Sequence, residues 1–422
     1  MSPKIVGKNI LCNLLEAQAV RLRKKNAFKV VAVAGSVGKT STKLAIAHTL
    51  SASTRVIYQE GNYNDRLTVP LTLFGHTLPG LMNLPAWIKI LLANERTIKH
   101  SFPYDIAVLE LGTDGPGQIA QFAYIKPDIT VVTAIAPEHM EFFKTLDAVA
   151  SEELGVIGFS AQTVVNIDDC PERYLEGRTV QTYGLDEKAD FRVMSWSSRG
   201  LDGISLEVKL GEETVSLASP MLGQSGAKIT SAAAAVALLV GVAKTQIAEA
   251  LVALPPTPGR MQILAGIHGS TIIDDTYNAS PTAVKSGLDV LFSTKAQKRF
   301  AILGSMNELG DYSPEAHREV GAHCDPNALD LVVTIGKQAQ DYLAPAAREA
   351  GCKVETFMDP YSAGKFLQDK LVEGAIVLGE GSQNGVFAEE ALKQILNNPE
   401  DAAKLVRQSS HWMRIKHAQF GE

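Results

Sequence analysis

The sequence predicts an α/β fold with two helix-covered sheets, and three observations support that prediction. Short apolar runs of strand length alternate with stretches of helical periodicity along most of the chain. The first such run ends in a glycine-rich loop that opens a helix, which is how a parallel α/β unit begins. The proline-rich segment LPPTPGR (254–260) divides the series in two, and 422 residues are too many for one ordinary core.

The first half begins with a helical pattern. Residues 8–25 carry apolar side chains at helical spacing, so a lead-in helix is expected within 1–28. The β-branched run KVVAVAG (29–35) predicts a strand, and KTSTKLAIAHTL (39–50) predicts a helix. Continuous apolar strands, typical of a sheet covered on both faces, are predicted at 105–111, 128–134 and 163–168. We therefore expect residues 29–255 to form a central P-loop ATPase-type domain with a parallel sheet.

The pattern changes in the later part of the chain. Residues 191–218 alternate in polarity around GLDG and GEE turns, which predicts an antiparallel flank of the central domain. A small-residue helix (227–242) then leads to the proline-rich boundary. Beyond it, residues 256–422 are expected to form a C-terminal Rossmann-like, doubly wound domain. Its strands are predicted at 270–275, 299–304, 330–336, 352–357 and 374–381.

Composition excludes several classes of protein. The formal net charge is −6, and the basic run RLRKK (21–25) is interpreted as a solvated helix face, so no nucleic-acid partner is expected. The four cysteines are scattered without a CxxC pair, which indicates reduced thiols in a cytoplasmic protein and no zinc site. No stretch reaches the roughly 18 apolar residues of a transmembrane segment.

The loop AGSVGKTS (34–41) carries the first chemical signal. Backbone N–H groups of such a loop, together with the helix N-terminus, point at phosphate oxygens. Lys39 would reach the β- and γ-phosphates of ATP, and Thr40 would hold Mg²⁺. The usual glycine five positions before Gly38 is Val33 here, and a glycine stands at position 35 instead. The strand–loop–helix context argues against a chance glycine-rich turn. The expected contacts are Gly35, Ser36, Val37, Gly38, Lys39, Thr40 and Ser41.

The loop and the segments that follow it resemble the Mur ligase family. The resemblance runs in order from about residue 29 to 385. It implies transfer of the γ-phosphate of ATP to a carboxylate, followed by displacement of phosphate from the acyl phosphate by an amine. The matching stretches are GNYNDRLTVPLTLFG (61–75), DIAVLELGTDGPGQIA (105–120), PDITVVTAIAPEHMEFF (127–143), VVNIDD (164–169), PGRMQ (258–262), DDTYNASPTAV (274–284), LGSMNELGDYSPEAHREVG (303–321) and GEGSQNG (379–385).

The resemblance assigns metal-site roles to three residues. Glu110, which ends an apolar strand, matches the family's Mg²⁺-holding glutamate, and His139 matches its metal-site histidine. Outside this register, such a Glu or His is more often structural or solvated. Glu153 stands where the family has a lysine whose carbamate helps bind a second Mg²⁺. Its carboxylate is a suitable ligand for a hard cation, but a solvated helix residue is the equal alternative.

The resemblance also assigns nucleotide and substrate contacts. Arg260, beside the proline-rich linker, matches an arginine that reaches the nucleotide phosphates, the alternative being a surface salt bridge. Asp275 and Asn278 match residues that the C-terminal domain places against the nucleotide, although such a pair is also ordinary turn chemistry. Asn62 and Asn64 match the asparagines of a substrate-side loop.

The sequence departs from the family pattern in several places. GQSG (223–226) replaces a Gly-x-His-Asn motif near the adenine, Glu380 replaces a lysine and Ser305 an aspartate. Members that use UDP-sugars carry an N-terminal domain, whereas about 30 residues precede the loop here, too few for a separate core. The acceptor is then held differently, a partner protein supplies the platform, or the acceptor is not a UDP-sugar. Residues 78–99 either add an apolar acceptor surface around Trp87 or pack in the core.

We expect an ATP- and Mg²⁺-dependent acid–amino-acid ligase. Lys39, Glu110 and His139 would be its catalytic residues. Its substrates would be a peptidoglycan-precursor carboxylate and an amino-acid or dipeptide amine such as D-Ala-D-Ala. Closure of the C-terminal domain would exclude water from the acyl phosphate. The alternatives are a ligase for another carboxylate, of polyglutamate or folate type, and a non-catalytic ATP-binding subunit, which Glu153, Glu380 and the GQSG segment would suit.

Overall fold

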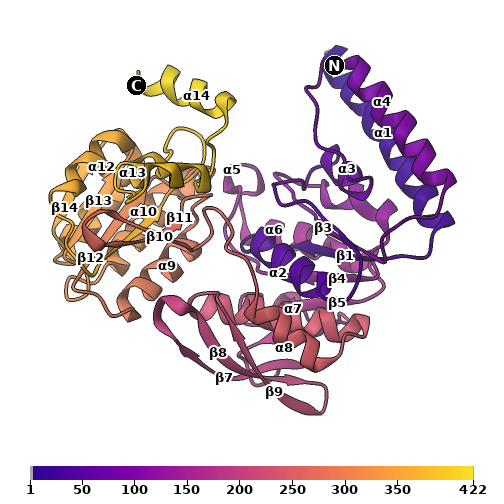
Figure 1. The fold of residues 1–422 in the computed structure, drawn as a ribbon, viewed down its shortest axis with the longest axis horizontal. Helices are drawn as coiled ribbons and strands as arrows, with labels where there is room; N and C mark the ends of the chain where they lie inside the picture. The colour runs from indigo at the N-terminus through magenta and orange to yellow at the C-terminus, as the bar shows by residue number, and fades with distance from the viewer. Residues whose placement is uncertain (1–2, 422) are drawn as a thin grey trace.

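The computed structural model describes residues 3–421, which form two sheets flanked by helices (Figure 1). The strands of the first sheet, in spatial order, are β2 (Val56–Ile57), β3 (Ile106–Glu110), β1 (Lys29–Ala34), β4 (Ile129–Val132), β5 (Thr163–Asn166), β6 (Gln181–Gly184), β7 (Phe191–Ser198), β8 (Ile204–Leu210) and β9 (Glu213–Ser219). Neighbours from β2 to β7 pair in parallel, and β8 and β9 extend the sheet in antiparallel fashion. The antiparallel flank is therefore as predicted.

The second sheet is parallel except at one edge. Its strands, in spatial order, are β10 (Gln262–Ala265), β11 (Thr271–Asp275), β15 (Ala375–Glu380), β12 (Lys298–Gly304), β13 (Leu331–Ile335) and β14 (Val354–Phe357). Only β10 pairs antiparallel, with β11. The edge strand β10 was not predicted. The α/β class with a second, wound sheet is confirmed.

Helices surround both sheets. Those of the first half are α1 (Pro3–Lys25), α2 (Lys39–Ser51), α3 (Thr68–Leu73), α4 (Leu84–Lys99), α5 (Met140–Phe143), α6 (Leu146–Glu153), α7 (Gly223–Val240) and α8 (Lys244–Val252). Those of the second half are α9 (Pro281–Ser293), α10 (Ser313–His323), α11 (Ala344–Glu349), α12 (Pro360–Gln368), α13 (Glu389–Lys393) and α14 (Ser410–Phe420).

Strand β1 lies between β3 and β4 and is covered on both faces. Val31 and Val33 belong to one hydrophobic core, and Val30 and Ala32 belong to the core on the opposite face. This burial on both faces explains why the strand reads as a continuous apolar run. The loop that follows β1 emerges at the carboxyl edge of the parallel sheet, where α/β proteins bind ligands.

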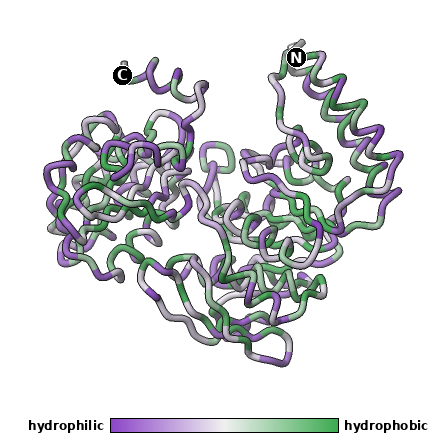
Figure 2. The backbone as a smooth tube through the Cα atoms, in the orientation of Figure 1, coloured by the Kyte–Doolittle hydropathy of each residue, from purple (hydrophilic) through white to green (hydrophobic). Residues whose placement is uncertain are grey.

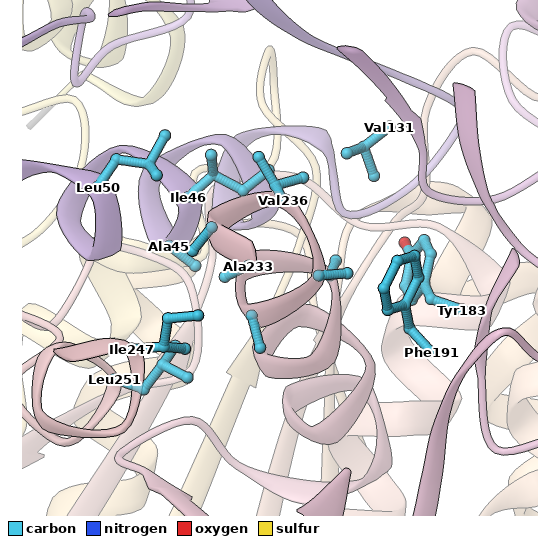
Figure 3. Packing of buried hydrophobic residues seen from close by; sticks show 14 of the residues in the cluster. Ala45, Ile46, Leu50, Val131, Tyr183, Phe191, Ala233, Val236, Ile247 and Leu251 are labelled. Atoms are coloured by element: carbon cyan, nitrogen blue, oxygen red, sulfur yellow. The ribbon is translucent and has the colours of Figure 1, made fainter. Parts of the chain in front are cut away.

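Helix α2 is held on the sheet by α7. Figure 3 shows Ala45 and Ile46 of α2 beside Ala233 and Val236 of α7, and all four are almost fully buried. The small alanine side chains allow the two helices to lie close together. Burying a side chain the size of Ile46 contributes about 1.5–3 kcal/mol. The helix that carries the candidate phosphate loop is thus fixed by the core.

Helices α1 and α4 lie side by side and extend away from the first sheet (Figure 1). Cys12 and Leu15 of α1 and Trp87 and Ile90 of α4 share a small core with Leu67 and Leu71 of the α3 region. Trp87 is only 3% exposed, so this residue packs in the core, which was the second alternative for residues 78–99.

The predicted domain bounds stay predictions. Residues 1–2 and 422, at the outer ends of the ranges 1–28 and 256–422, lie outside the described residues. Within 3–421, no helix combines the length and the apolar character needed to cross a bilayer.

Candidate active site

The loop between β1 and α2 requires glycine at two positions. Gly35 has a φ of +115°, and a Cβ there would come within 2.5 Å of Thr133 Oγ1. Gly38 has a φ of +86° and directly precedes α2. Both conformations are open to glycine and costly for other residues. The glycine at position 35, displaced from the usual spacing, is therefore required by the close approach of Thr133 and Ala134, which directly follow β4.

A cavity of about 580 Å³ opens at this loop and is lined by both halves of the chain. Eleven of the predicted site residues line it. They are Ser36, Val37, Gly38, Lys39, Thr40, Asn62, Asn64, Glu110, His139, Arg260 and Asn278. A second cavity of about 140 Å³ adjoins it, with Ser41 and Asp275 in its walls. The structure thus brings most of the predicted site together, but neither cavity is lined by Gly35 or Glu153.

Lys39 opens α2 and points its ammonium group at the loop. Its Nζ donates to Ser36 O at 2.9 Å and lies 3.3 Å from Glu138 Oε2. Burial lowers the pKa of Lys39, but the carboxylates of Glu138, Glu153 and Glu110 outweigh it, so the pKa is raised. Lys39 therefore keeps its positive charge. This charge and the adjacent helix N-terminus together favour the binding of an anion.

Glu110, at the end of β3, is the centre of a buried polar network. Thr40 Oγ1 and Asn64 Nδ2 donate to Glu110 Oε1 at 3.3 Å and 3.1 Å. Glu110 Oε2 lies 3.2 Å from Lys43 Nζ, and both side chains are 2% exposed. Burial lowers the pKa of Lys43, and the negative charge of Glu110 offsets part of this lowering. Lys43 stands one helical turn after Lys39, on the same face of α2.

The oxygen donors of this network fit a magnesium ion. The Thr40 hydroxyl and the Glu110 carboxylate meet at the cavity wall, and Mg²⁺ is commonly held by one or two carboxylates with substrate phosphates and water. Within residues 3–421, no three His, Cys, Asp or Glu side chains form a cluster able to hold a metal on their own. A site completed by phosphate oxygens is consistent with both observations.

His139 lies among carboxylates from both halves of the chain. Its Nδ1 lies 3.0 Å from Glu308 Oε2, and its Nε2 lies 3.6 Å from Asp114 Oδ1 and 3.7 Å from Glu138 Oε1. Burial lowers the pKa of His139, but these acidic neighbours outweigh it and raise the pKa. A cationic imidazole is a poor metal ligand. The metal role of His139 stays a prediction, and the contacts indicate an ion pair that joins the two halves.

Glu153 lies beneath the loop. Its Oε2 accepts a hydrogen bond from Gly35 N at 2.7 Å, and the residue is 2% exposed. Burial raises the pKa of Glu153 to about 7. The solvated-helix alternative is therefore wrong. The metal-ligand role stays a prediction, and the observed contact supports the loop backbone.

The second half of the chain contributes an arginine from the segment before β10 and two acids from the second sheet. The Arg260 guanidinium lies 4.2 Å from the centre of the Tyr277 ring, and Arg260 borders both cavities. Asp275 Oδ1 accepts from Met261 N at 3.2 Å, and burial raises the pKa of Asp275 to about 6. Glu380 pairs with Asp275 in the register of β15 and β11 and is fully buried. Burial and the neighbouring Asp275 raise the pKa of Glu380 well above its usual range.

Among the residues that the structure places in or beside the site, Glu138, Lys43, Asp114 and Glu308 had been assigned no role from the sequence. Glu138 directly precedes His139, and Lys43 follows Lys39 by one helical turn, so adjacency was a usable signal for both. Asp114 and Glu308 lay within quoted family motifs, but nothing in the sequence showed that they face His139.

Comparison with known proteins identifies the protein family and the class of enzyme. The Mur ligase middle domain matches residues 33–239, and the Mur ligase, glutamate ligase domain matches residues 259–383. The chain belongs to the Mur ligase family. The predicted class, an ATP-dependent acid–amino-acid ligase, is confirmed.

Several similar proteins are ligases of one name. UDP-N-acetylmuramoyl-tripeptide–D-alanyl-D-alanine ligase of Bacillus subtilis is 29% identical over 88% of this chain and 76% of its own. The ligase of the same name from Synechocystis is also 29% identical, over 89% and 77%. The MurF ligase from Thermotoga maritima, solved in complex with ADP, superposes with a TM-score of 0.73 at 26% identity, over 93% of this chain and 84% of that one. Folylpolyglutamate synthase from Mycobacterium tuberculosis, with a TM-score of 0.66 at 16% identity, shares the fold alone.

Proposed function

We propose that the protein joins D-alanyl-D-alanine to the peptide carboxylate of a UDP-N-acetylmuramoyl-tripeptide, with ATP converted to ADP and phosphate. The observation that carries the proposal is the joint cavity, where Lys39, Thr40 and Glu110 of the first half face Arg260 and Asn278 of the second. The identity to ligases of that name over most of the chain supports the choice of substrates.

The loop residues would bind the phosphates of ATP. The N–H groups at the start of α2 and the Lys39 ammonium face the cavity, and both favour an anion. Thr40 and Glu110 would hold Mg²⁺, which supplies positive charge to the phosphate oxygens. Ser41 and Asp275 would contact the nucleoside in the adjoining cavity.

The reaction would proceed in two steps. A carboxylate oxygen of the tripeptide attacks the γ-phosphorus, ADP leaves, and an acyl phosphate forms. The amine of the dipeptide then attacks the acyl carbon, phosphate leaves, and the amide forms with loss of a proton from nitrogen. A carboxylate and a triphosphate repel one another, so the cationic side chains of Lys39 and Arg260 would bring them together. Asn62 and Asn64 would orient the acceptor from the facing loop.

The experiment is ADP release with matched substrate pairs. UDP-N-acetylmuramoyl-tripeptide with D-Ala-D-Ala should raise turnover well above the rate with either substrate alone, and mass spectrometry should detect the pentapeptide product. Lys39→Ala should lower that rate by about 10²–10³-fold, the scale of losing one charged transition-state contact. Turnover only with glutamate and a folate or polyglutamate acceptor would replace the proposed substrates. ATP binding without turnover on any pair would contradict catalysis itself.

A further inference from the structure

The pair formed by α1 and α4, with the turn before α4, carries an apolar surface, and of its residues only Leu78 also lines the cavity. Among the described residues, fifteen large hydrophobic side chains are exposed, and nine of them lie on α1, on α4 or in the turn before α4. Such a concentration is unlike the single scattered hydrophobic residues of an ordinary surface. The nine are Val6, Ile10, Leu14, Leu78, Leu81, Met82, Leu84, Ile88 and Leu92.

The two helices run in the same direction. Gln18 Nε2 of α1 donates to Leu91 O at 2.9 Å and to Glu95 Oε1 at 2.8 Å on α4. Further along, Lys25 Nζ donates to Lys99 O at 2.7 Å. Residue numbers therefore rise together along the pair, and the N-terminal ends of both helices lie at the same end. That end extends away from the rest of the molecule (Figure 1).

The apolar side chains form a row on each helix. Val6, Ile10 and Leu14 follow one another at four-residue spacing on α1, as Leu84, Ile88 and Leu92 do on α4. Each row lies on the side of its helix away from the buried residues, which include Leu15 on α1 and Trp87 on α4. In Figure 2, hydrophobic residues recur along both helices of the pair. We call these two rows the apolar face of the helix pair.

The helix pair is basic on an acidic protein. Residues 6–25 contain five Lys or Arg against one Glu, and Leu84–Lys99 contains three against one, while the whole chain has a net charge of −6. Several of these cations are exposed near the C-terminal ends of both helices: Arg21, Lys24, Lys25, Arg96 and Lys99. An apolar row combined with exposed cations is the pattern by which helices bind an anionic bilayer surface.

The charge also argues against a second copy of this chain as the occupant. A symmetric dimer would place the same face of both copies together, so two basic surfaces would meet. Anionic lipid head groups supply the opposite charge, and the acyl chains beneath them accept the apolar rows.

We propose that the α1–α4 pair docks on an anionic phospholipid bilayer without crossing it. The inference does not depend on the proposed substrates. The pair is tied to the loop beside the cavity, since Arg66 Nη2 donates to Asn13 Oδ1 at 2.6 Å and Lys8 Nζ lies 3.7 Å from Asp65 Oδ2. Docking would therefore hold the substrate-side loop and the cavity next to the membrane surface.

Co-sedimentation with lipid vesicles tests the proposal. The full chain should sediment with vesicles of phosphatidylcholine and phosphatidylglycerol, much less with phosphatidylcholine alone, and less again at high salt. Ile10→Glu with Ile88→Glu, and separately Lys24→Glu with Arg96→Glu, should each weaken binding by roughly tenfold or more. Val252→Glu is the matched control, because Val252 is as exposed as Ile10, 57% each, but lies on α8. It should leave binding unchanged.

Two results would overturn the proposal. The first is a vesicle result: the wild-type chain does not sediment with vesicles, or its sedimentation does not depend on lipid charge, or the Ile10/Ile88 variant sediments as well as the wild type. The other is self-association on gel filtration that disappears in the Ile10/Ile88 variant while no vesicle binding is detected, which would assign the apolar face to a contact between copies. Circular dichroism of every variant establishes that a variant with weakened binding is still folded.

Discussion

Two buried carboxylates near the site, one from each half of the molecule, are stabilised in opposite ways. In the first half, Glu110 faces the ammonium group of Lys43 at 3.2 Å, and both are 2% exposed. In the second half, Glu380 is buried beside another acid, Asp275, and the pKa of Glu380 is raised well above its usual range by burial and by that neighbour. A buried carboxylate thus needs either a cation or a proton, and beside this site Glu110 has the cation while Glu380 is favoured in its protonated form.

Removing the cation from the first half should have the largest effect. Lys43→Met leaves Glu110 buried without its cationic partner, and the expected loss is about 3–5 kcal/mol in the free energy of unfolding. Urea unfolding at neutral pH measures it. The double variant Lys43→Met with Glu110→Gln removes the unpaired charge, so it should recover much of the loss. Equal stability of the single and double variants would contradict the ion-pair interpretation.

The acid pair of the second half should show itself in the pH dependence of stability. Burial raises the folded-state pKa of Asp275 to about 6, and burial together with the neighbouring Asp275 raises the pKa of Glu380 well above its ordinary value. The folded chain therefore binds more protons than the unfolded chain from about pH 4 upward, and the contribution of this pair to stability falls as the pH rises through that window.

Glu380→Gln isolates that contribution. The variant removes one of the two titrating groups, so it should be more stable than the wild type at pH 8 and close to the wild type in stability at pH 4.5. Urea unfolding at a series of pH values gives the two curves. Parallel curves for the variant and the wild type would show that Glu380 does not cause the decline in stability with rising pH.

The smallest expected effect concerns the carboxylate under the loop. The pKa of Glu153 is raised to about 7 by burial, so it loses its proton near neutral pH. Its negative charge then opposes a phosphate at the loop, and ADP affinity should weaken as the pH rises from 6 to 8. Glu153→Gln keeps an acceptor for Gly35 N and should make the affinity less dependent on pH, by roughly threefold over that range. Calorimetric titration of ADP against both proteins measures the difference; identical pH profiles would exclude Glu153 as the cause.

The sequence predicted those features that depend on neighbouring residues. Hydrophobic periodicity was enough for the α/β class, and the loop motif was enough for the placement of Lys39 and Thr40 at a helix start. The contact of Glu153 with Gly35 could not be predicted, because it depends on how α6 returns beneath the loop. The pairing of Asp275 with Glu380 depends on the strand order, in which β15 lies beside β11 although β12, β13 or β14 could have taken that place.

The ion pair between His139 and Glu308 has a consequence for motion. Each half of the chain contributes one member, so the contact has to break whenever the halves separate. A single proton on the imidazole decides whether the contact is an attraction between charges or a neutral hydrogen bond. Alkaline solution and high salt should therefore both weaken this contact between the two halves.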